Sequence, residues 1–193
     1  MDDLKLDNAR INYLTQEDVT KLLVAIKEDT EVDLFTRLSL STGGRLQTIM
    51  NLKAKDFSNS NITLYDFKSK KTYTSFIAVA LLPKMDETLK NLKPNDYVIG
   101  RSKELYSSRK IQRRLKKVLD ELFNKGLDVG DSKNRIVVHS LRHTFASLLV
   151  IAGTPIFDVM KLMNHSSIEM TMRYAKLAPD SGKNAINSLF IAV

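Results

Sequence analysis

The sequence predicts a mainly α-helical fold with one small antiparallel β-hairpin. Along most of the chain, apolar residues recur three and four positions apart, which is the pattern of amphipathic helices. Residues 61–81 differ, because they are rich in β-branched and aromatic side chains on both sides of the polar turn Lys68–Lys71. Such a segment is typical of two paired strands, here with a lysine-rich tip.

The composition limits the classes of function. The chain has 193 residues, enough for one good core or two small ones, and it has no cysteine, so disulfide frameworks and thiolate metal sites are excluded. No apolar run approaches the roughly 20 residues of a membrane span, and the first ten residues lack the apolar region of a signal peptide. We therefore expect a soluble, intracellular protein. Its net charge of +8 favours a polyanionic partner, above all nucleic acid.

The first half of the chain offers one candidate site residue, Arg45. Thr15, with Asp18 three residues later, predicts the capped start of a helix, and a second helix is expected over residues 32–41. That helix ends before two glycines, which allow the backbone to turn sharply ahead of Arg45. Arg45 is then either placed to reach into a cleft or a solvated surface residue.

The hairpin tip carries Lys68, Lys70 and Lys71. Lysines commonly protect exposed strand edges from unwanted pairing. Alternatively, a flexible tip of this kind carries an ammonium group into a groove of DNA. Both interpretations are open from the residues alone.

A strongly basic segment spans residues 101–117. It holds eight lysines and arginines against the single acid Glu104, so it alone contributes +7 to the net charge. A helix is expected to begin near Ser107 or Ser108 and to end by Gly126. We interpret its charged face as one that binds DNA phosphates rather than as a solvated face. With Lys70 and Lys71 of the hairpin, the candidate DNA-binding residues are Arg109, Lys110, Arg113, Arg114 and Lys117.

Residues 138–177 contain all three histidines of the chain. Ser140 is expected to cap a helix, so that His139 and Arg142, three residues apart, lie on one side of its N-terminus. Free N–H groups and a fixed guanidinium there suit a phosphate. We interpret His143 as structural, because we expect it to face away from His139.

The same segment ends in a second pair of candidates. His165 lies in a tight turn, and Tyr174 is expected on a short helix over residues 168–174, about two turns later. No nucleotide-binding glycine pattern and no metal-ligand spacing occurs in the sequence. Because the candidate groups are cationic or neutral rather than clustered carboxylates, we expect no metal site.

Together these residues resemble the catalytic domain of the tyrosine recombinases, also called the phage integrase family. The resemblance rests on the order Arg45, Lys68, His139-x-x-Arg142, His165 and Tyr174. The string HSLRHTFASLLVIAGTPIFDVMKLMNHSSIEMTMRYA is similar to the second conserved region of the family, and STGGRLQTIMNLKAKDF resembles the first. Two positions depart from the usual pattern: Thr48 replaces a common glutamate, and Met163-Asn164-His165 replaces Leu-Gly-His.

The resemblance implies a site-specific recombinase that cleaves and rejoins DNA through a 3′-phosphotyrosyl bond, without metal, ATP or another cofactor. It implies that Tyr174 is the nucleophile and that Arg45 and Arg142 stabilise the transition state. His165 would donate a hydrogen bond to the phosphate, and His139 would assist proton transfer from Tyr174. Lys68 would protonate the leaving 5′-oxygen, with Lys70 and Lys71 as alternatives.

The resemblance also implies an organisation and a set of partners. Residues 15–180 would form the catalytic domain, and residues 1–14 a linker or the remnant of a missing N-terminal DNA-binding domain. The partner would be double-stranded DNA, bound by a tetramer on paired sites, and the free chain would be a monomer. We expect a cytoplasmic, nucleoid-associated protein encoded by a bacterium or a phage, with no membrane contact. A type IB topoisomerase-like enzyme and a DNA-binding module without cleavage are the alternatives.

The end of the chain, residues 181–193, repeats apolar residues at helical spacing. This pattern predicts a C-terminal helix. It either folds back on its own domain or docks in trans on a neighbouring subunit, and we expect the second.

Overall fold

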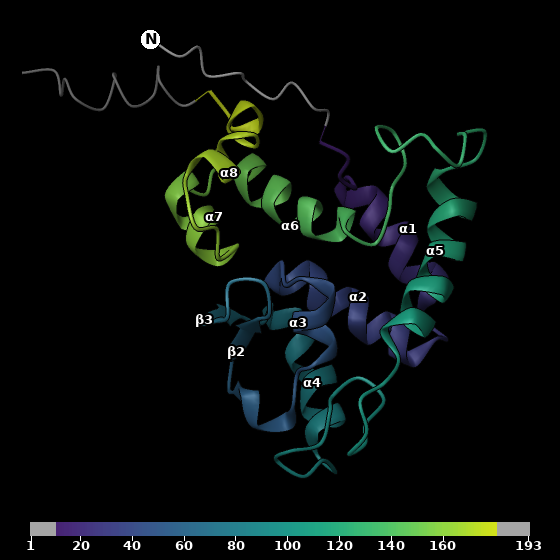
Figure 1. The fold of residues 1–193 in the computed structure, drawn as a ribbon, viewed down its shortest axis with the longest axis vertical. Helices are drawn as coiled ribbons and strands as arrows, with labels where there is room; N and C mark the ends of the chain where they lie inside the picture. Colours follow the sequence, from purple (N-terminus) through teal and green to yellow (C-terminus); the bar gives the residue numbers. More distant parts are fainter. Residues whose placement is uncertain (1–10, 181–193) are drawn as a thin grey trace, which may run out of the picture.

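The structure, a computed structural model, describes residues 11–180 (Figure 1). The predicted C-terminal helix and most of the predicted linker lie outside these residues. The fold is mainly helical with one small antiparallel sheet, as the sequence predicts. In chain order the elements are α1 (Gln16–Ile26), α2 (Thr30–Thr42), α3 (Leu46–Met50), β1 (Phe57–Ser58), β2 (Asn61–Asp66), β3 (Lys71–Phe76), α4 (Leu82–Leu89), α5 (Ser108–Phe123), α6 (Ser140–Ile151), α7 (Ile156–Leu162) and α8 (Glu169–Met172).

The helix α2 lies at the centre of the larger core. It contacts α1, α3, α5 and α6, so its apolar side chains are buried on several sides rather than along one stripe. Val32, Phe35 and Leu38 are each at most 1% exposed. A helix surrounded in this way fixes the relative positions of the elements that carry the candidate site.

The starts of α1 and α2 follow from their capping residues. Thr15 and Asp18 form the predicted capping box, in which the Asp18 amide donates to Thr15 Oγ1 at 3.2 Å. Asp29 caps α2, because its Oδ1 accepts a hydrogen bond from the Val32 amide at 3.2 Å. Consequently α2 begins at Thr30, two residues earlier than the sequence predicts.

The sheet has the order β1-β2-β3, and its strands are antiparallel. Alternate residues of β2 are buried, ending with Asp66. Asp66 is paired in register with Lys71, so residues 67–70 form the lysine-containing turn. The predicted second strand is too long, because the chain leaves the sheet at Phe76 and forms a 3-10 turn before α4.

A second apolar cluster joins α6, α7 and the segment that follows α8. It contains Phe145, Val150, Val159, Met163 and Tyr174. Figure 1 shows α7 and α8 at one end of α6, at the opposite end from α5. This cluster holds the late part of the chain against the helix that carries Arg142.

The start of α6 differs from the prediction. His139, rather than Ser140, is the residue before the first helical turn, and its side chain makes no capping hydrogen bond. Ser140 Oγ instead accepts a hydrogen bond from the Val137 amide at 3.0 Å. His139 therefore stands at the very end of the helix, beside the solvent.

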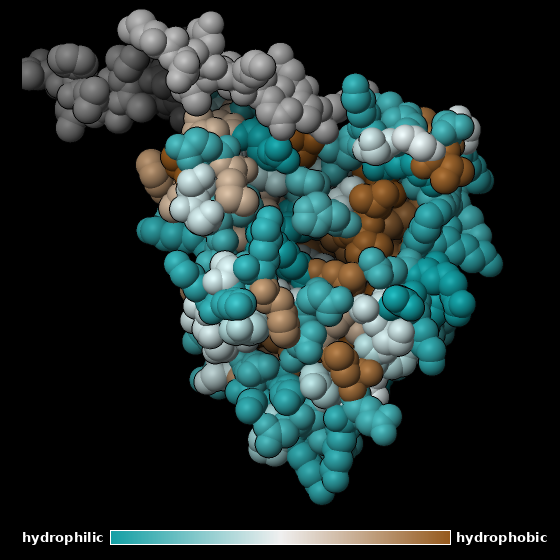
Figure 2. All heavy atoms as spheres, in the orientation of Figure 1, coloured by the Kyte–Doolittle hydropathy of each residue, from teal (hydrophilic) through white to brown (hydrophobic). Residues whose placement is uncertain are grey.

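The described surface is mostly polar. Figure 2 shows hydrophilic residues over most of one face, with hydrophobic residues gathered between the start of α6 and α5. Among residues 11–180, no helix combines the length and the apolar character that crossing a membrane requires.

Candidate active site

All six residues that the sequence predicts as catalytic line one cavity of about 270 Å³. They come from four parts of the chain: the turn after α2, the hairpin, the start of α6 and the segment after α7. Three further residues line the same cavity, His143, Met170 and Arg173, and none of them is among the predicted site residues.

Arg142 lies on the first turn of α6 and is almost fully buried. Its Nη1 donates to the carbonyl oxygen of Gly43 and its Nη2 to that of Met163, each at 2.5 Å. Burial, followed by the nearby charge of Arg45, lowers the pKa of Arg142 to about 10. The group is still a cation at neutral pH, and carbonyl oxygens do not neutralise it. An anion in the cavity would therefore be strongly stabilised.

The turn before Arg45 requires glycine. Gly43 ends α2 with φ +64°, and a Cβ atom there would lie 2.3 Å from the ring of Phe145. This close approach brings the Gly43 carbonyl oxygen within reach of Arg142. The chain then enters α3 directly after Arg45, which leaves the Arg45 side chain beside Arg142 in the cavity.

Asp66 is the carboxylate of the site, and the sequence patterns did not reveal it. It forms an ion pair with Arg45, accepts from the Lys68 amide at 2.9 Å and accepts from Asn164 Nδ2 at 3.3 Å. Burial raises the pKa of Asp66, but hydrogen bonds from Lys68 and the charge of Arg45 outweigh it and lower the pKa overall. Its position as the last buried residue of β2 was the available signal.

Lys68 follows closely after Asp66, and its exposed side chain lines the cavity. Lys70, in the turn with a positive φ of 56°, and Lys71, the first residue of β3, are both exposed and do not line it. The geometry thus separates Lys68 from the two alternatives. Its assignment as the acid for the leaving oxygen stays a prediction.

His165 enters the cavity from the turn after α7. Its Nδ1 lies 2.8 Å from Thr171 Oγ1, which orients the ring. The preceding Asn164 has φ 47°, a conformation that asparagine adopts more readily than most residues, and it occupies the position where the family often has glycine. Burial, followed by the charges of Arg142 and Arg45, lowers the pKa of His165 to about 4. The ring is therefore neutral at physiological pH.

Tyr174 is 1% exposed, with its ring in the second apolar cluster and its hydroxyl at the cavity. It lies just after α8, on a 3-10 turn rather than on the predicted short helix. Its Oη is 2.7 Å from His143 Nδ1. Burial raises the pKa of Tyr174 above its ordinary value, so the phenol is protonated at neutral pH.

The expectation that His143 faces away from His139 is wrong. Residues four apart lie on the same face of a helix, and the two imidazole rings meet edge to face with centroids 4.9 Å apart. Burial, with the charges of His139, Arg173 and Arg142, lowers the pKa of His143 to about 4. Burial and the charges of Arg142, Arg45 and Arg173 also lower the pKa of His139, which keeps part of its surface exposed.

The cavity therefore combines arginine charges with neutral imidazoles and a phenol. Such a set can bind a phosphodiester and offer it a nucleophile, hydrogen-bond donors and a lysine ammonium. In the described part of the chain, no three histidine, aspartate or glutamate side chains are grouped so that they could bind a metal ion.

A comparison with known proteins identifies the family of the chain. Residues 12–180 match the model of the phage integrase family. The chain belongs to this family. The sequence is 29% identical over 184 residues to the integrase of Escherichia phage P2, covering 95% of this chain and 48% of that protein. It is 29% identical over 181 residues to the tyrosine recombinase XerA of Pyrococcus furiosus, covering 90% and 60%.

Among solved structures of integrases, the catalytic domain of the bacteriophage HP1 integrase is similar throughout. It superposes with a TM-score of 0.69 at 27% identity, covering 92% of this chain and 95% of that domain. The chain spans about half the length of its phage integrase relatives, with 48%, 50% and 46% covered in three of them. The match thus concerns the catalytic domain of an integrase.

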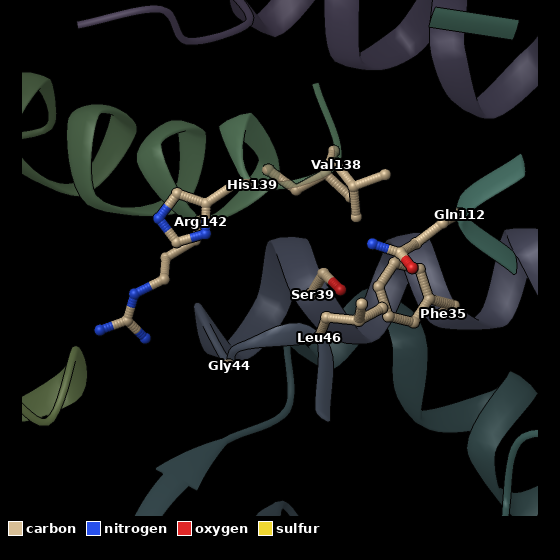
Figure 3. A pocket seen from close by; sticks show the side chains of 9 residues that line it. Phe35, Ser39, Gly44, Leu46, Gln112, Val138, His139 and Arg142 are labelled. Atoms are coloured by element: carbon tan, nitrogen blue, oxygen red, sulfur yellow. The ribbon is translucent and has the colours of Figure 1, made fainter. Parts of the chain in front are cut away.

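The basic helix α5 lies next to the cavity. A neighbouring pocket of about 190 Å³ connects them, with His139 and Arg142 of the site at one end and Gln112 of α5 at the other (Figure 3). Arg109, Lys110 and Arg113 are exposed on α5. They are therefore free to meet a ligand that extends beyond the cavity.

Other cations of α5 have partners within the protein. Arg114 donates from Nε to Asp29 Oδ2 at 2.7 Å and from Nη1 to the Tyr106 hydroxyl at 2.6 Å. Lys117 lies 3.9 Å from Glu121, an acid one turn later that the count of residues 101–117 leaves out. Acidic residues therefore balance more of the positive charge of this face than the sequence suggests. Arg114 joins α5 to the start of α2.

Proposed function

We propose that this chain is the catalytic part of a site-specific recombinase that cleaves and rejoins double-stranded DNA through a 3′-phosphotyrosyl bond at Tyr174. The observation that carries the proposal is the meeting of six residues from four parts of the chain in one cavity: Arg45, Lys68, His139, Arg142, His165 and Tyr174. Membership of the phage integrase family supports it.

The scissile phosphate enters the cavity beside Arg45 and Arg142. Arg142 is held by two carbonyl oxygens and Arg45 by Asp66, so both guanidiniums are oriented before DNA arrives. As Tyr174 Oη attacks, negative charge grows on the non-bridging oxygens, and groups fixed in advance stabilise that charge without reorganisation. His165 donates a further hydrogen bond from its Nε2, since Thr171 occupies Nδ1.

The leaving 5′-oxygen takes a proton from Lys68, the exposed ammonium at the mouth of the cavity. The phosphotyrosyl bond conserves the energy of the broken phosphodiester, so rejoining needs no ATP. The arginines carry out the charge stabilisation that metal ions supply in other phosphoryl-transfer sites.

The substrate extends past the cavity along α5. Exposed Arg109, Lys110 and Arg113, with Lys117 and the hairpin residues Lys70 and Lys71, contact phosphates on either side of the cleaved bond. Strand exchange then takes place on paired DNA sites within a tetramer, assembled from chains that are monomeric when free. We expect the reaction in the cytoplasm, on nucleoid DNA.

The test uses nicked suicide substrates made from DNA of the source genome. Wild-type chain is expected to form a protein–DNA adduct that survives denaturing gels, and the adduct is expected to be equal in EDTA and in magnesium. Tyr174→Phe is expected to bind DNA but to form no adduct. A wild-type chain that binds DNA without an adduct would instead be a binding module, and relaxation of supercoils without a defined site would indicate a topoisomerase.

A further inference from the structure

The hydrogen bond between Tyr174 and His143 concerns the residue that accepts the Tyr174 proton, a role that the resemblance implies for His139. Tyr174 Oη lies 2.7 Å from His143 Nδ1, within the range of a good hydrogen bond. Resting on the proposed function, we propose that His143 is the base that accepts the Tyr174 proton during attack on the phosphate. His139, which the resemblance implies for this transfer, then supports His143 rather than touching the nucleophile.

The arrangement of the two histidines supports this order. His139 meets the His143 ring at an interplanar angle of 89°, with centroids 4.9 Å apart, whereas His143 and Tyr174 are hydrogen-bonded. Within residues 11–180, His143 is the hydrogen-bond partner of the Tyr174 hydroxyl. A base must reach the proton that it removes, and His143 does so without any movement.

The charges around His143 keep it ready to accept a proton. The groups that face it are His139 and Arg142 on α6, Arg173 after α8, and Tyr174 itself. With burial, they lower the pKa of His143 to about 4, so the ring is neutral at physiological pH. When Nε2 carries the ring proton, the Nδ1 lone pair points at the phenol.

A ring of low basicity suffices, because the acidity of the phenol changes during the reaction. Burial raises the pKa of Tyr174, so its proton stays on oxygen in the free protein. Once Oη begins to bond to phosphorus, the O–H group becomes far more acidic and the transfer becomes favourable. The negative phosphate in the cavity also raises the basicity of the nearby imidazole.

Protons and electron pairs balance in this step. The Tyr174 O–H bond breaks and its proton forms an N–H bond at His143 Nδ1, while the freed electron pair of Oη bonds to phosphorus. The bond between phosphorus and the 5′-oxygen breaks, and that oxygen takes a proton from Lys68. In rejoining, the cationic His143 returns its proton to the departing Tyr174 oxygen, so no oxidant, metal or nucleotide is consumed.

The test compares His143→Ala and His143→Gln with His139→Ala in single-turnover adduct formation. Both His143 variants are expected to slow the reaction by about 100-fold, the usual range for removal of a general base. Imidazole added to His143→Ala is expected to restore at least about tenfold, with rates that follow the basicity of substituted imidazoles. The Gln variant retains a polar side chain but has no titrating ring. A slower reaction in this variant therefore reports the loss of proton transfer rather than a change in packing.

Imidazole that restores His139→Ala and not His143→Ala would move the base to His139 and overturn the proposal. So would a His143→Ala chain that forms adduct at the wild-type rate while Tyr174→Phe forms none; that outcome leaves the proposed function intact. A wild-type chain without any adduct overturns both together.

A second measurement needs no activity and no variant of His143. Imidazole nitrogen NMR of the DNA-free chain at neutral pH is expected to show a hydrogen-bonded Nδ1 for His143 that shifts in Tyr174→Phe. His165, which is bonded to Thr171 instead, is the internal control and is expected to stay unchanged. A His143 Nδ1 chemical shift that is the same in wild type and in Tyr174→Phe would contradict the contact on which the proposal rests.

Discussion

Asp66 connects three parts of the candidate site through one carboxylate. It pairs with Arg45 from the α2–α3 turn, accepts from the Lys68 amide of the hairpin and accepts from Asn164 after α7. Because it is buried, its charge acts in a medium that screens little. Asp66 therefore orients Arg45 and also offsets part of the positive charge that the phosphate meets.

Removal of this carboxylate is expected to impair chemistry more than binding. In Asp66→Ala, Arg45 loses its orientation, and misplacement of a catalytic group costs about 10- to 100-fold in rate. Affinity for DNA is expected to stay equal or to rise, since a negative charge is lost. The measurement is single-turnover adduct formation together with a binding titration.

The matched control is Asp158→Ala on α7, an exposed carboxylate 3.4 Å from Lys161. It is expected to behave as wild type. Equal cleavage rates for the Asp66 and Asp158 variants would show that Arg45 needs no partner.

The lowered pKa values of His143 and His165 predict that the folded state loses stability in weak acid. The pKa values of His143 and His165 fall from the ordinary 6.5 to about 4 on folding. Above pH 6.5 they are neutral in both states, whereas between 6.5 and 4 the unfolded chain binds protons that the folded chain does not. The melting temperature is thus expected to be flat above about pH 6.5 and to fall by several degrees as the pH approaches about 4.

Thermal unfolding of wild type and of His165→Asn across this window checks the sign. The variant loses one of the two depressed groups, so its melting temperature is expected to fall less steeply with pH. Parallel curves for the two proteins would show that His165 does not cause the loss of stability.

Single residues were predictable from the sequence where they carry a local motif. The order of Arg45, His139 and Arg142 marks the cavity, and the structure brings them together with Tyr174. Asp66 could not be found in this way, because its partner Asn164 lies 98 residues away and no local pattern records that contact. His143 could have been found, since a spacing of four from His139 already predicts a shared helix face.

At the scale of the element, α5 has two kinds of arginine that its sequence does not distinguish. Arg109 is exposed to solvent, and Arg113 is exposed one turn later. Arg114 is bound to Asp29, an acid 85 residues earlier. Helical periodicity separates the polar from the apolar face, but it does not show which cation an acid from a distant segment will reach.

Substitution of the two kinds of arginine is expected to change different quantities, the salt dependence of DNA binding in one case and the unfolding free energy in the other. Loss of Arg109 and Arg113 together removes about two phosphate contacts, so the salt dependence of DNA binding is expected to flatten by about two units of slope, with unchanged unfolding free energy. Arg114→Ala is expected to lower the unfolding free energy by about 1–2 kcal/mol, since charged hydrogen bonds are lost at a part-exposed site, and to leave the slope unchanged.

Binding titrations over a series of salt concentrations, with urea unfolding of each variant, measure both quantities. An Arg114 variant that flattens the salt slope as much as the double variant does would show that the whole face of α5 meets DNA. An unchanged slope in the double variant would mean that the exposed arginines point to water.

At the scale of the whole molecule, we expect the sequence beyond Leu177 to contribute to assembly. Apolar residues recur at helical spacing over residues 185–191, outside the described part of the chain. Docking of this segment on a neighbouring subunit would link assembly to Tyr174, which precedes it closely in the chain. Deletion from Asn184 onward is therefore expected to reduce multimers on paired DNA sites more than binding to a single site.

Gel shifts and sedimentation with one-site and two-site DNA measure the two effects. The full chain without DNA is the reference and is expected to sediment as a monomer. If the shortened chain forms multimers on DNA as well as the full chain does, the segment folds back on its own domain.

The helix α2 is bound at both ends to elements of different function. Asp29, just before it, binds Arg114 of α5, and Gly43, just after it, accepts a hydrogen bond from Arg142. Its 13 residues rise about 1.5 Å each, so these two points are about 20 Å apart. Along B-DNA that length equals about six base pairs. Because both ends of α2 are anchored in this way, we expect the distance between the cleaved bond and the DNA beneath α5 to be fixed within the protein, so that the two parts of the site cannot shift independently along a target.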